Sequence, residues 1–313
     1  MIQLSVVILN WNAAADTIRC VRHIEAWQQL KPAIWVVDNA SSDGSTEIIA
    51  GECPRVHLVR NTSNLGFAGG NNRGIAEALA AGDAPILLLN NDAVIGETDT
   101  VRLLETLAAD ERIGFIGPLL FDAEQKERLL AAGGGSPVKH HHSHFHSFNP
   151  DKPVFSVTYI PGTAIIGRAE VFRRVGLLDE AFFFSAEIAD LCMRAGRYGY
   201  LSVIDARARA FHTLGRSSQW RGTLYTYYII RNRFILLRNH HRRNIFLYAF
   251  WTLYSAALAL KLQLSGQVQT AQAVRLGLLD GLQGRFGGQN ERVLAATHPQ
   301  PSLPLASKVK ADL

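Results

Sequence analysis

The first half of the chain alternates short apolar runs with segments whose apolar residues recur at helical spacing. The apolar runs lie at residues 4–9, 33–37, 56–59 and 85–90. Consecutive large aliphatic residues are typical of strands buried on both faces, as in a parallel sheet. Helices are predicted over 13–30, in a short stretch from 46, in a segment ending at 81 and over 98–109. This alternation indicates βαβ units, and therefore an α/β fold with a mostly parallel sheet flanked by helices.

The pattern is less regular after residue 110. Further β character is predicted over 113–121, 154–166, 201–204 and 209–212, with helices over 168–175 and from 187. Residues 122–153 show no periodicity, and they include a histidine-rich tract at 140–146. Such a tract can bind metal. Because no second cluster accompanies it, we favour a mobile loop instead.

The C-terminal third differs in character from the rest. We expect a helix over 220–240 that carries Tyr225, Tyr227, Tyr228 and several arginines. The run 245–260 is almost wholly apolar, but it is shorter than the roughly 20 residues that usually span a bilayer. The tail from 298 is rich in Pro, Ser and Lys, so we expect it to be disordered.

Composition adds few constraints. A chain of 313 residues that is 48% hydrophobic can bury a large core in one domain or two. The first residues lack the pattern of a secretory signal, so we expect no export. Cys20, Cys53 and Cys192 are scattered, which argues against a disulfide framework or a zinc site and fits a reducing cytosol.

Charge is divided unevenly along the chain. Residues 206–279 contain eleven Lys and Arg and no Asp or Glu. The total net charge is +5 and the last 34 residues carry +1, so the first 205 residues carry −7. A basic, aromatic segment suggests an anionic partner, either a membrane or a nucleic acid. The apolar run 245–260, flanked by Arg242, Arg243 and Lys261, favours lipid, whereas burial in a core or a homodimer is the alternative.

Polar side chains follow the predicted strands at one edge of the sheet. Asn90, Asn91 and Asp92 end the fourth apolar run, and Asn10 and Asn12 follow the first. In open α/β sheets this edge binds ligands, and a hard cation such as Mg²⁺ or Mn²⁺ prefers oxygen ligands. Asn90 and Asp92 are therefore candidate metal and pyrophosphate residues. The alternative is an ordinary turn, which Asn and Asp also favour.

Two further segments carry candidate chemistry. The loop 61–72 is rich in Asn and Gly and leads into a helix, whose first amides could meet an anion, although it could also be a plain connection. Glu187 and Asp190 are three residues apart on a predicted helix, where they could supply a general base or only complement the helix dipole. His212 could bind metal, but sequence alone favours a polar strand end.

Several of these segments together resemble the family 2 glycosyltransferases, particularly bacterial rhamnosyltransferases of surface-polysaccharide assembly. The resemblance spans about residues 4–287 and rests on the motifs at 5–12, 36–45, 64–71, 88–92, 175–183, 190–192 and 231–233. It implies a GT-A fold, in which a nucleotide-diphosphate sugar binds at the C-terminal edge of the sheet. The expected donor is a UDP- or dTDP-sugar, and the expected acceptor is a glycan or a polyprenyl-linked glycan covered by the loop 122–153.

The resemblance also assigns roles to residues. Asp38 would hydrogen-bond the base, with Asn10 and Asp43 nearby. Other donor-binding candidates are Asn12, Asn64, Gly66, Asn71 and Asn91. Asn90 and Asp92 stand where the family has its metal motif, and His212 would complete a site for Mg²⁺ or Mn²⁺. A carboxylate would then deprotonate the acceptor hydroxyl for displacement with inversion.

One position departs from the family pattern. Family members usually carry Glu-Asp at the start of the helix near 187, with the Asp as catalytic base, but here the pair is Glu187-Ile188. Either Glu187 or Asp190 takes the role, and we favour Glu187. The competing hypothesis is a non-catalytic nucleotide-sugar-binding or scaffold protein.

These observations predict three segments. Residues 1–219 form the catalytic domain, 220–297 a basic helical extension that associates with membrane, and 298–313 the disordered tail. We expect the protein in the cytoplasm, peripherally bound to the inner face of a bacterial cell membrane, with no nucleic-acid partner.

Overall fold

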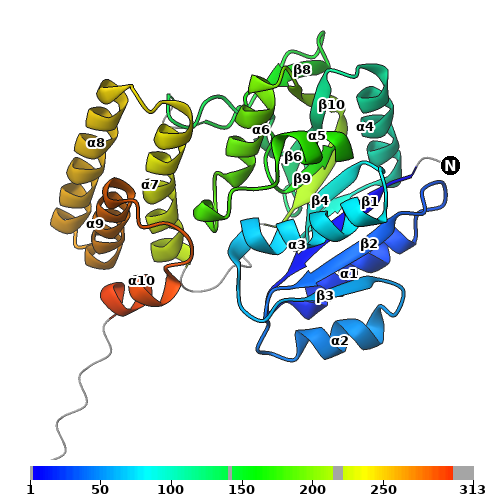
Figure 1. Cartoon of the computed structure of the whole chain (residues 1–313), viewed down its shortest axis with the longest axis horizontal. Coiled ribbons are helices and arrows are strands. Elements are labelled where there is room, and N and C mark those ends of the chain that lie inside the picture. Colours follow the sequence, from blue (N-terminus) through cyan, green and yellow to red (C-terminus); the bar gives the residue numbers. More distant parts are fainter. Residues whose placement is uncertain (1–2, 140–142, 214–220, 299–313) are drawn as a thin grey trace, which may run out of the picture.

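The computed structural model describes residues 3–139, 143–213 and 221–298. An α/β part built on one sheet lies beside a bundle of helices (Figure 1). The predicted disordered tail beyond 298, the histidines at 140–142 and the predicted helix start at 220 lie outside the described residues.

The α/β part contains ten strands. They are β1 (Ser5–Asn10), β2 (Ala33–Asp38), β3 (His57–Arg60), β4 (Ile86–Asn90), β5 (Ala93–Ile95), β6 (Ile113–Asp122), β7 (Leu129–Ala131), β8 (Val154–Val157), β9 (Ala164–Gly167) and β10 (Leu201–His212). Its helices are α1 (Ala14–Glu25), α2 (Ser45–Glu52), α3 (Gly66–Ala81), α4 (Glu97–Ala109), α5 (Ala169–Val175) and α6 (Glu187–Arg197), with a 3-10 turn η1 (Glu180–Phe182). The bundle consists of α7 (Arg221–His240), α8 (Ile245–Leu264), α9 (Val268–Gln283) and α10 (Asn290–Thr297).

The α/β prediction is confirmed, but the sheet is mixed. Its strand order is β3-β2-β1-β4-β9-β6-β10-β5, with β7 paired to β6 and β8 paired to β10. The first four strands in this order are parallel, as predicted. Strand β9 then lies antiparallel between β4 and β6. The β character predicted over 154–166 belongs to two strands at different places in the sheet, β8 and β9. The two short strands predicted over 201–204 and 209–212 are one irregular strand, β10.

Helices cover both faces of the sheet, and side chains alternate between them as strand geometry requires. On β1, Val6 and Ile8 pack in one core with α1, α2 and α4. Val7 packs on the other face, in the core that contains α3, α5 and α6. The strand ends carrying polar residues therefore emerge at one edge between two helical layers.

The glycine-rich stretch predicted to be a loop mostly belongs to α3, so that part of the prediction is wrong. Helix α3 begins at Gly66 and packs closely on the sheet. A Cβ atom at Gly70 would lie 2.4 Å from Leu9, and one at Gly74 would lie 2.4 Å from Val7. These glycines are needed because helix and strand approach closely, and not because the chain turns there.

In the bundle, the predicted segments 220–240 and 245–260 correspond to helices α7 and α8. The structure adds α9 and α10 after them. Helix α8 continues to Leu264, four residues beyond the predicted apolar run. Among the described helices, α8 is the one long and apolar enough to cross a membrane. Only 17% of its apolar stretch is buried inside the protein. Length and composition alone are weak evidence for a span. Its buried residues Trp251, Ser255 and Ala259 lie four apart and face the bundle.

Candidate active site

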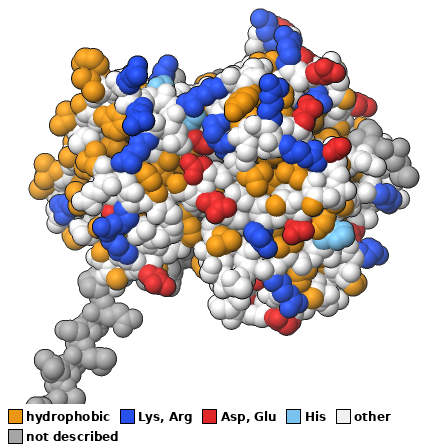
Figure 2. Space-filling view, in the orientation of Figure 1, with side chains coloured by type: hydrophobic (Ala, Val, Ile, Leu, Met, Phe, Trp, Pro, Cys, Tyr) orange, Lys and Arg blue, Asp and Glu red, His pale blue; other side chains and the backbone are white. Residues whose placement is uncertain are grey.

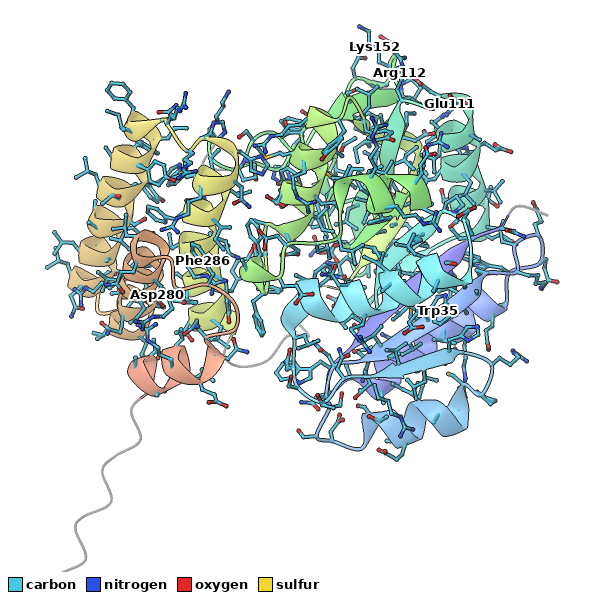
Figure 3. The ribbon with its side chains drawn as sticks, in the orientation of Figure 1. Trp35, Glu111, Arg112, Lys152, Asp280 and Phe286 are labelled. Atoms are coloured by element: carbon cyan, nitrogen blue, oxygen red, sulfur yellow. The ribbon has the colours of Figure 1, made fainter. Side chains whose placement is uncertain are left out.

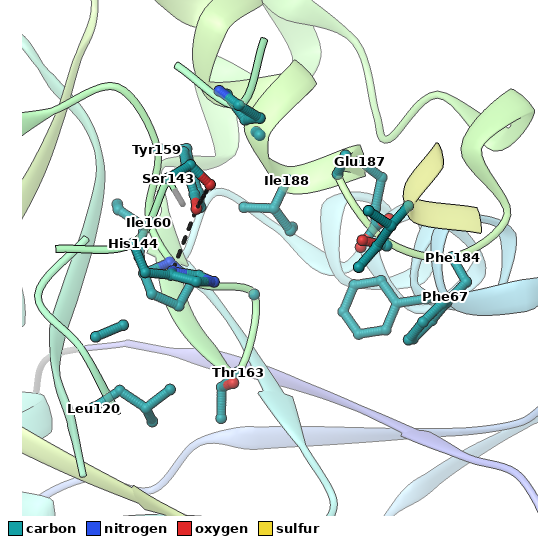
Figure 4. Close-up of a pocket in the computed structure, with 18 of the residues that line it drawn as sticks. Phe67, Leu120, Ser143, His144, Tyr159, Ile160, Thr163, Phe184, Glu187 and Ile188 are labelled. Atoms are coloured by element: carbon teal, nitrogen blue, oxygen red, sulfur yellow. Dashed lines mark hydrogen bonds between the residues drawn. The ribbon is translucent and has the colours of Figure 1, made fainter. Parts of the chain in front are cut away.

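A cavity of about 600 Å³ opens at the C-terminal edge of the central strands. One wall consists of the sheet edge, with Asn90, Thr163 and His212. The start of α6 forms a second wall, and one side of α7 forms a third. Figure 4 shows Glu187 and Phe67 on one side of this space and the pair Tyr159 and His144 on another. The position agrees with the general rule for ligand sites in open α/β sheets.

The structure brings together the residues predicted to bind metal. Asp92 follows β4 and His212 ends β10, and these strands come from distant parts of the sequence. His212 Nε2 lies 3.1 Å from Asp92 Oδ1. Asn90 lines the same cavity as His212. In the described part of the chain there is no group of three or more His, Cys, Asp or Glu placed to hold a metal ion.

This donor set fits a divalent cation that is shared with a substrate. Mg²⁺ is usually bound by one or two protein carboxylates together with substrate phosphates, and manganese accepts oxygen and imidazole ligands. Asp92 supplies one carboxylate, His212 an imidazole and Asn90 an amide oxygen. The remaining coordination positions would be left to water and diphosphate oxygens.

Three predicted donor-site residues form part of a hydrogen-bonded chain across the strand ends. Asn91 Nδ2 donates to Thr17 Oγ1 at 3.0 Å, and Thr17 Oγ1 donates to Asn10 Oδ1 at 2.8 Å. Asn10 Nδ2 then donates to Asp38 Oδ1 at 2.8 Å. The chain links the ends of β4, β1 and β2 through helix α1, and thereby fixes the edge that faces the ligand site.

Asp38 is enclosed by donors from the protein. Its oxygens accept hydrogen bonds from the side chains of Asn10, Ser41 and Thr46 and from the Ser41 amide. Burial alone would raise the pKa of Asp38, but these hydrogen bonds outweigh it and hold the pKa below its ordinary value. The carboxylate is only 2% exposed. In this conformation Asp38 holds the loop after β2. A nucleotide base that hydrogen-bonds to Asp38 would therefore have to replace one of these donors.

The neighbouring polar residues also shape this loop. Asn12 Oδ1 accepts a hydrogen bond from the Ser42 amide at 2.8 Å, and Asp43 Oδ1 accepts one from the Ser45 amide at 3.0 Å. Asn12 has a φ of 51°, which asparagine tolerates better than most residues. Both side chains therefore stabilise the turns that present the loop to the ligand edge.

Asn39 is a central residue that the sequence analysis did not select. Its Nδ2 donates to Asn64 Oδ1 and to the Gly66 carbonyl, each at 3.0 Å. Its Oδ1 accepts from Asn61 Nδ2 and from the Leu65 amide, each at 3.0 Å. All donor and acceptor groups of this buried amide join the end of β2 to the turn before α3. The sequence signal that could have identified Asn39 is its position directly after Asp38, at the end of a buried strand.

The predicted anion site at the start of α3 is not present in this conformation. The amides of Phe67 and Ala68 both donate to the Phe183 carbonyl, at 2.7 and 3.3 Å. Gly66 has a φ of +71°, and a Cβ atom there would lie 2.3 Å from that carbonyl oxygen. Asn71 lies inside the helix and donates to the Phe67 carbonyl at 2.9 Å. A distant loop therefore caps this helix end.

Glu187 is the only Asp or Glu among the described residues that line the cavity. It is the first residue of α6, it is 6% exposed, and its Oε2 has no hydrogen-bond partner. Burial raises the pKa of Glu187 to about 7, the backbone hydrogen bond lowers it, and the negative charge of Asp190 raises it. A buried carboxylate with an unused oxygen and a pKa near neutrality has the properties of a general base.

Asp190 is directed elsewhere. It accepts hydrogen bonds from His240 Nε2 at 2.8 Å, Asn239 Nδ2 at 3.0 Å and Arg194 Nε at 2.6 Å. Burial would raise its pKa, but His240, Arg194 and Asn239 together lower it. Asp190 therefore joins α6 to the end of α7, and the structure separates the two carboxylates that the sequence offered as alternatives.

The loop before Glu187 has an unusual backbone. Phe183, Ser185 and Ala186 all have positive φ, at 60°, 73° and 73°. Such conformations are costly for residues other than glycine and persist only where the surroundings impose them. Asn232 Nδ2 donates to the carbonyls of Phe182, Phe184 and Ser185, at 3.1, 2.7 and 2.7 Å.

Arg231 completes this support. Its Nη2 donates to the carbonyls of Ala181 and Phe182, at 3.1 and 2.7 Å, and its Nη1 donates to Gly287. Arg231 and Asn232 are both fully buried, and Arg231 Nε donates to Asn232 Oδ1 at 2.9 Å. The sequence analysis included Arg231 and Asn232 only as part of the motif at 231–233. It could not predict which main-chain carbonyls they contact.

The cavity wall also contains a polar cluster of three residues, Ser143, His144 and Tyr159, that the predicted site did not include. Tyr159 Oη lies 2.7 Å from Ser143 Oγ and 3.3 Å from His144 Nδ1, as the dashed lines in Figure 4 show. His144 belongs to the histidine-rich tract, which was the sequence signal for this wall. Hydroxyl and imidazole groups can each donate and accept hydrogen bonds, so this wall is polar.

The raised pKa of Glu187 predicts a pH-dependent effect on stability. Its pKa is higher in the folded protein than the ordinary 4.5, so the wild type loses stability as pH rises from about 4.5 to about 7. Glu187→Gln removes this penalty. The variant should gain up to about 3 kcal/mol over wild type above pH 7, and the gain should vanish near pH 4.

Urea unfolding at several pH values measures this difference, and Glu170→Gln on the exposed side of α5 is a matched control. A difference between Glu187→Gln and wild type that stays constant from pH 4 to 8 would show that Glu187 does not titrate as described.

Comparisons with known proteins agree with this geometry. The model of glycosyl transferase family 2 matches residues 5–176. The chain is 25% identical to the N-acetylglucosaminyl-diphospho-decaprenol L-rhamnosyltransferase of Mycobacterium tuberculosis, over 89% of this chain and 98% of that protein. It is 26% identical to the dTDP-rhamnosyl transferase RfbF of Shigella flexneri, over 90% of this chain and 96% of that protein.

A solved structure shows the same fold. The mannosyltransferase PcManGT of Pyrobaculum calidifontis, solved with GDP-Man and Mn²⁺, superposes with a TM-score of 0.56 at 14% identity, over 90% of this chain and 87% of that chain. The family match covers more than half of the sequence, and its residues supply the first four parallel strands and most of the ligand edge. The chain belongs to glycosyl transferase family 2.

Proposed function

We propose that the protein transfers a sugar, with inversion, from a nucleotide-diphosphate donor to a hydroxyl of a lipid-linked or polysaccharide glycan. The observation that carries the proposal is Glu187, a buried carboxylate with an unpaired oxygen at the wall of the cavity that holds Asn90 and His212. A protein that only bound nucleotide sugars would gain nothing from keeping such a costly group.

Glu187 acts as the general base in this proposal. Its free oxygen accepts the proton of the acceptor hydroxyl as that oxygen attacks the anomeric carbon, while the bond to the donor diphosphate breaks on the opposite face. With a pKa of about 7, close to half of the Glu187 side chains are ionised at neutral pH. Ile188 and Phe67 line the same cavity and limit the access of water to the base.

Asp92, His212 and Asn90 would hold a divalent cation at the donor end. Such a cation offsets the charge that develops on the leaving diphosphate. PcManGT was solved with Mn²⁺ together with its donor, which supports the same use here. The names of the two relatives point to dTDP-rhamnose as the donor and to a glycan on a polyprenyl diphosphate as the acceptor.

Helix α8 supports attachment at the inner face of the cell membrane. Its outward residues Phe246, Leu253 and Leu260 lie seven apart and are 82%, 70% and 57% exposed. Figure 2 shows apolar side chains along the outer edge of the bundle and Lys and Arg side chains near its upper end, where α8 begins. An apolar helix face beside basic residues is typical of proteins that lie in the interface of an anionic membrane.

Donor binding tests the metal-binding residues. Calorimetric titration with UDP- and dTDP-sugars should show tighter binding to the wild type with Mn²⁺ than without it. Asp92→Ala should lose this difference, because it removes the one carboxylate of the proposed metal set. Asp83→Ala, at an exposed position on the opposite edge of the sheet, is the control. An unchanged effect of Mn²⁺ in Asp92→Ala would refute its role as a ligand.

Steady-state turnover tests whether Glu187 is the general base. Glu187→Gln should leave the dissociation constant of the donor unchanged and lower kcat by at least about 10²-fold. In the wild type, kcat should rise with pH through about 7, because only the ionised Glu187 accepts a proton. Steady-state rates across pH 5.5–9 measure both effects. If Glu187→Gln keeps wild-type turnover, another group is the base.

Vesicle binding tests the α8 surface. Replacing Phe246, Leu253 and Leu260 by Ser should lower the partition coefficient onto vesicles containing anionic lipid by at least about tenfold, because each apolar side chain contributes on the order of 1.5 kcal/mol. Ile48→Ser, on exposed α2, provides the control. Equal sedimentation of the triple variant and the wild type would assign α8 to another partner.

A further inference from the structure

One face of α7 forms a wall of the cavity. Tyr225, Ile229, Arg233 and Leu236 line the cavity at spacings of four, four and three residues, which places them on one side of the helix. Three of these side chains are largely apolar, and Arg233 is the only Lys or Arg among the described residues that line the cavity. A single cation within an apolar stripe is an arrangement suited to a ligand that is itself part anion and part hydrocarbon.

Arg233 is held toward α8. Its guanidinium carbon lies 3.8 Å from the ring centre of Trp251, a residue of α8 that is 1% exposed. The Trp251 indole is itself fixed, because its Nε1 donates to the Val138 carbonyl at 2.9 Å. Burial lowers the pKa of Arg233 to about 10, and the side chain therefore stays positively charged at neutral pH.

Arg231 and Arg233 differ in where they lie relative to the cavity. Arg231 precedes Arg233 by two residues and so lies on a different side of α7. It donates to the main-chain carbonyls of Ala181, Phe182 and Gly287 and is absent from the cavity wall. Arg233 instead borders the cavity, on the side where α7 meets the helix that carries the exposed apolar face.

We propose that Arg233 binds a phosphate group of the acceptor, so that α7 supplies the site for the diphosphate that joins the lipid to its glycan. This deepens the proposed function and rests on it. The guanidinium would pair with the phosphate oxygens, as arginine commonly does. Ile229 and Leu236 offer apolar contacts to the first lipid carbons.

The same cavity would then contain two separate anion sites. The cation that Asp92, His212 and Asn90 would hold serves the diphosphate of the donor, and Arg233 serves that of the acceptor, with Glu187 on the wall from which α6 begins. Two sites explain why Arg233 is on α7, whereas the proposed metal ligands are on β10, at the end of β4 and in the turn after it. A volume of about 600 Å³ is in the range of pockets that enclose small ligands, so both reacting groups can meet there.

Direct binding can test the inference without turnover. The probe is geranyl diphosphate, a soluble prenyl diphosphate, titrated calorimetrically without divalent cation and in the presence of a chelator. Geranyl glucoside is the neutral comparison. Arg233→Gln should weaken binding of geranyl diphosphate by about tenfold or more, in line with the loss of a charge-assisted hydrogen bond. Its affinity for geranyl glucoside should stay within about twofold of the wild-type value.

Three controls separate the alternatives. Arg238→Gln removes a cation from the same helix, where Arg238 packs on Phe286 outside the described cavity wall, and should bind both probes like the wild type. Asp92→Ala should also keep its affinity for geranyl diphosphate, which distinguishes this site from the donor site. Arg233→Gln should sediment normally with anionic vesicles, which distinguishes an acceptor phosphate from lipid headgroups.

Equal affinity of Arg233→Gln and wild type for geranyl diphosphate would overturn the inference, as would an equal loss of affinity for both probes. Loss of vesicle binding with unchanged probe binding would assign Arg233 to the bilayer surface instead. Failure of the proposed function would show as absent donor binding or absent transfer in the wild type, and neither outcome affects the measured contribution of Arg233 to diphosphate binding.

Discussion

The active site depends on a buried arginine and asparagine that hold an otherwise unfavourable loop. Arg231 and Asn232 donate to main-chain carbonyls of Ala181, Phe182, Phe184 and Ser185, directly before Glu187. Burial of a guanidinium is costly unless it is well compensated. Tyr227 and Tyr228 lie against Arg231, with ring centres 5.5 and 4.7 Å from its guanidinium carbon. Tyr227 Oη also donates to Asp280 at 2.7 Å. Figure 3 shows Asp280 within the bundle. Helix α7, which follows residue 220, thus holds the segment that leads to Glu187, the proposed base.

The same loop also contacts the start of α3. The Phe183 carbonyl accepts hydrogen bonds from the first amides of α3, while the turn before α3 is fixed by Asn39 and Asn64 at the donor edge. Arg231, Asn232 and the α3 amides therefore all hold one short segment, residues 181–185, and Glu187 lies two residues beyond it in the chain.

The sequence predicted those features that depend on local pattern. Buried runs marked the first four parallel strands and the polar residues at their ends, so Asn10, Asp38, Asn90 and Asp92 could be placed at one edge. Contacts between distant segments could not be predicted. Insertion of β9 between β4 and β6, the Phe183 carbonyl at the start of α3, and the pairing of Asp190 with His240 all join residues more than 45 positions apart. The glycines of α3 were misjudged for the same reason, since their function lies in contact with β1 and not in their own backbone.

Ile188 follows Glu187, the proposed base, directly in the chain. The family that the sequence resembles usually carries Asp at this position, and a second carboxylate there would raise the electrostatic cost of ionising both groups. Ile188 instead packs against Gly162, where a Cβ atom would lie 3.0 Å from its side chain, and it is 4% exposed. An apolar neighbour removes water from the adjacent carboxylate, and burial is the largest cause of the raised pKa of Glu187. The apolar side chain that stands in place of the expected carboxylate therefore adds to the burial that raises the pKa of Glu187, and the proposed role of Glu187 as base depends on that raised pKa.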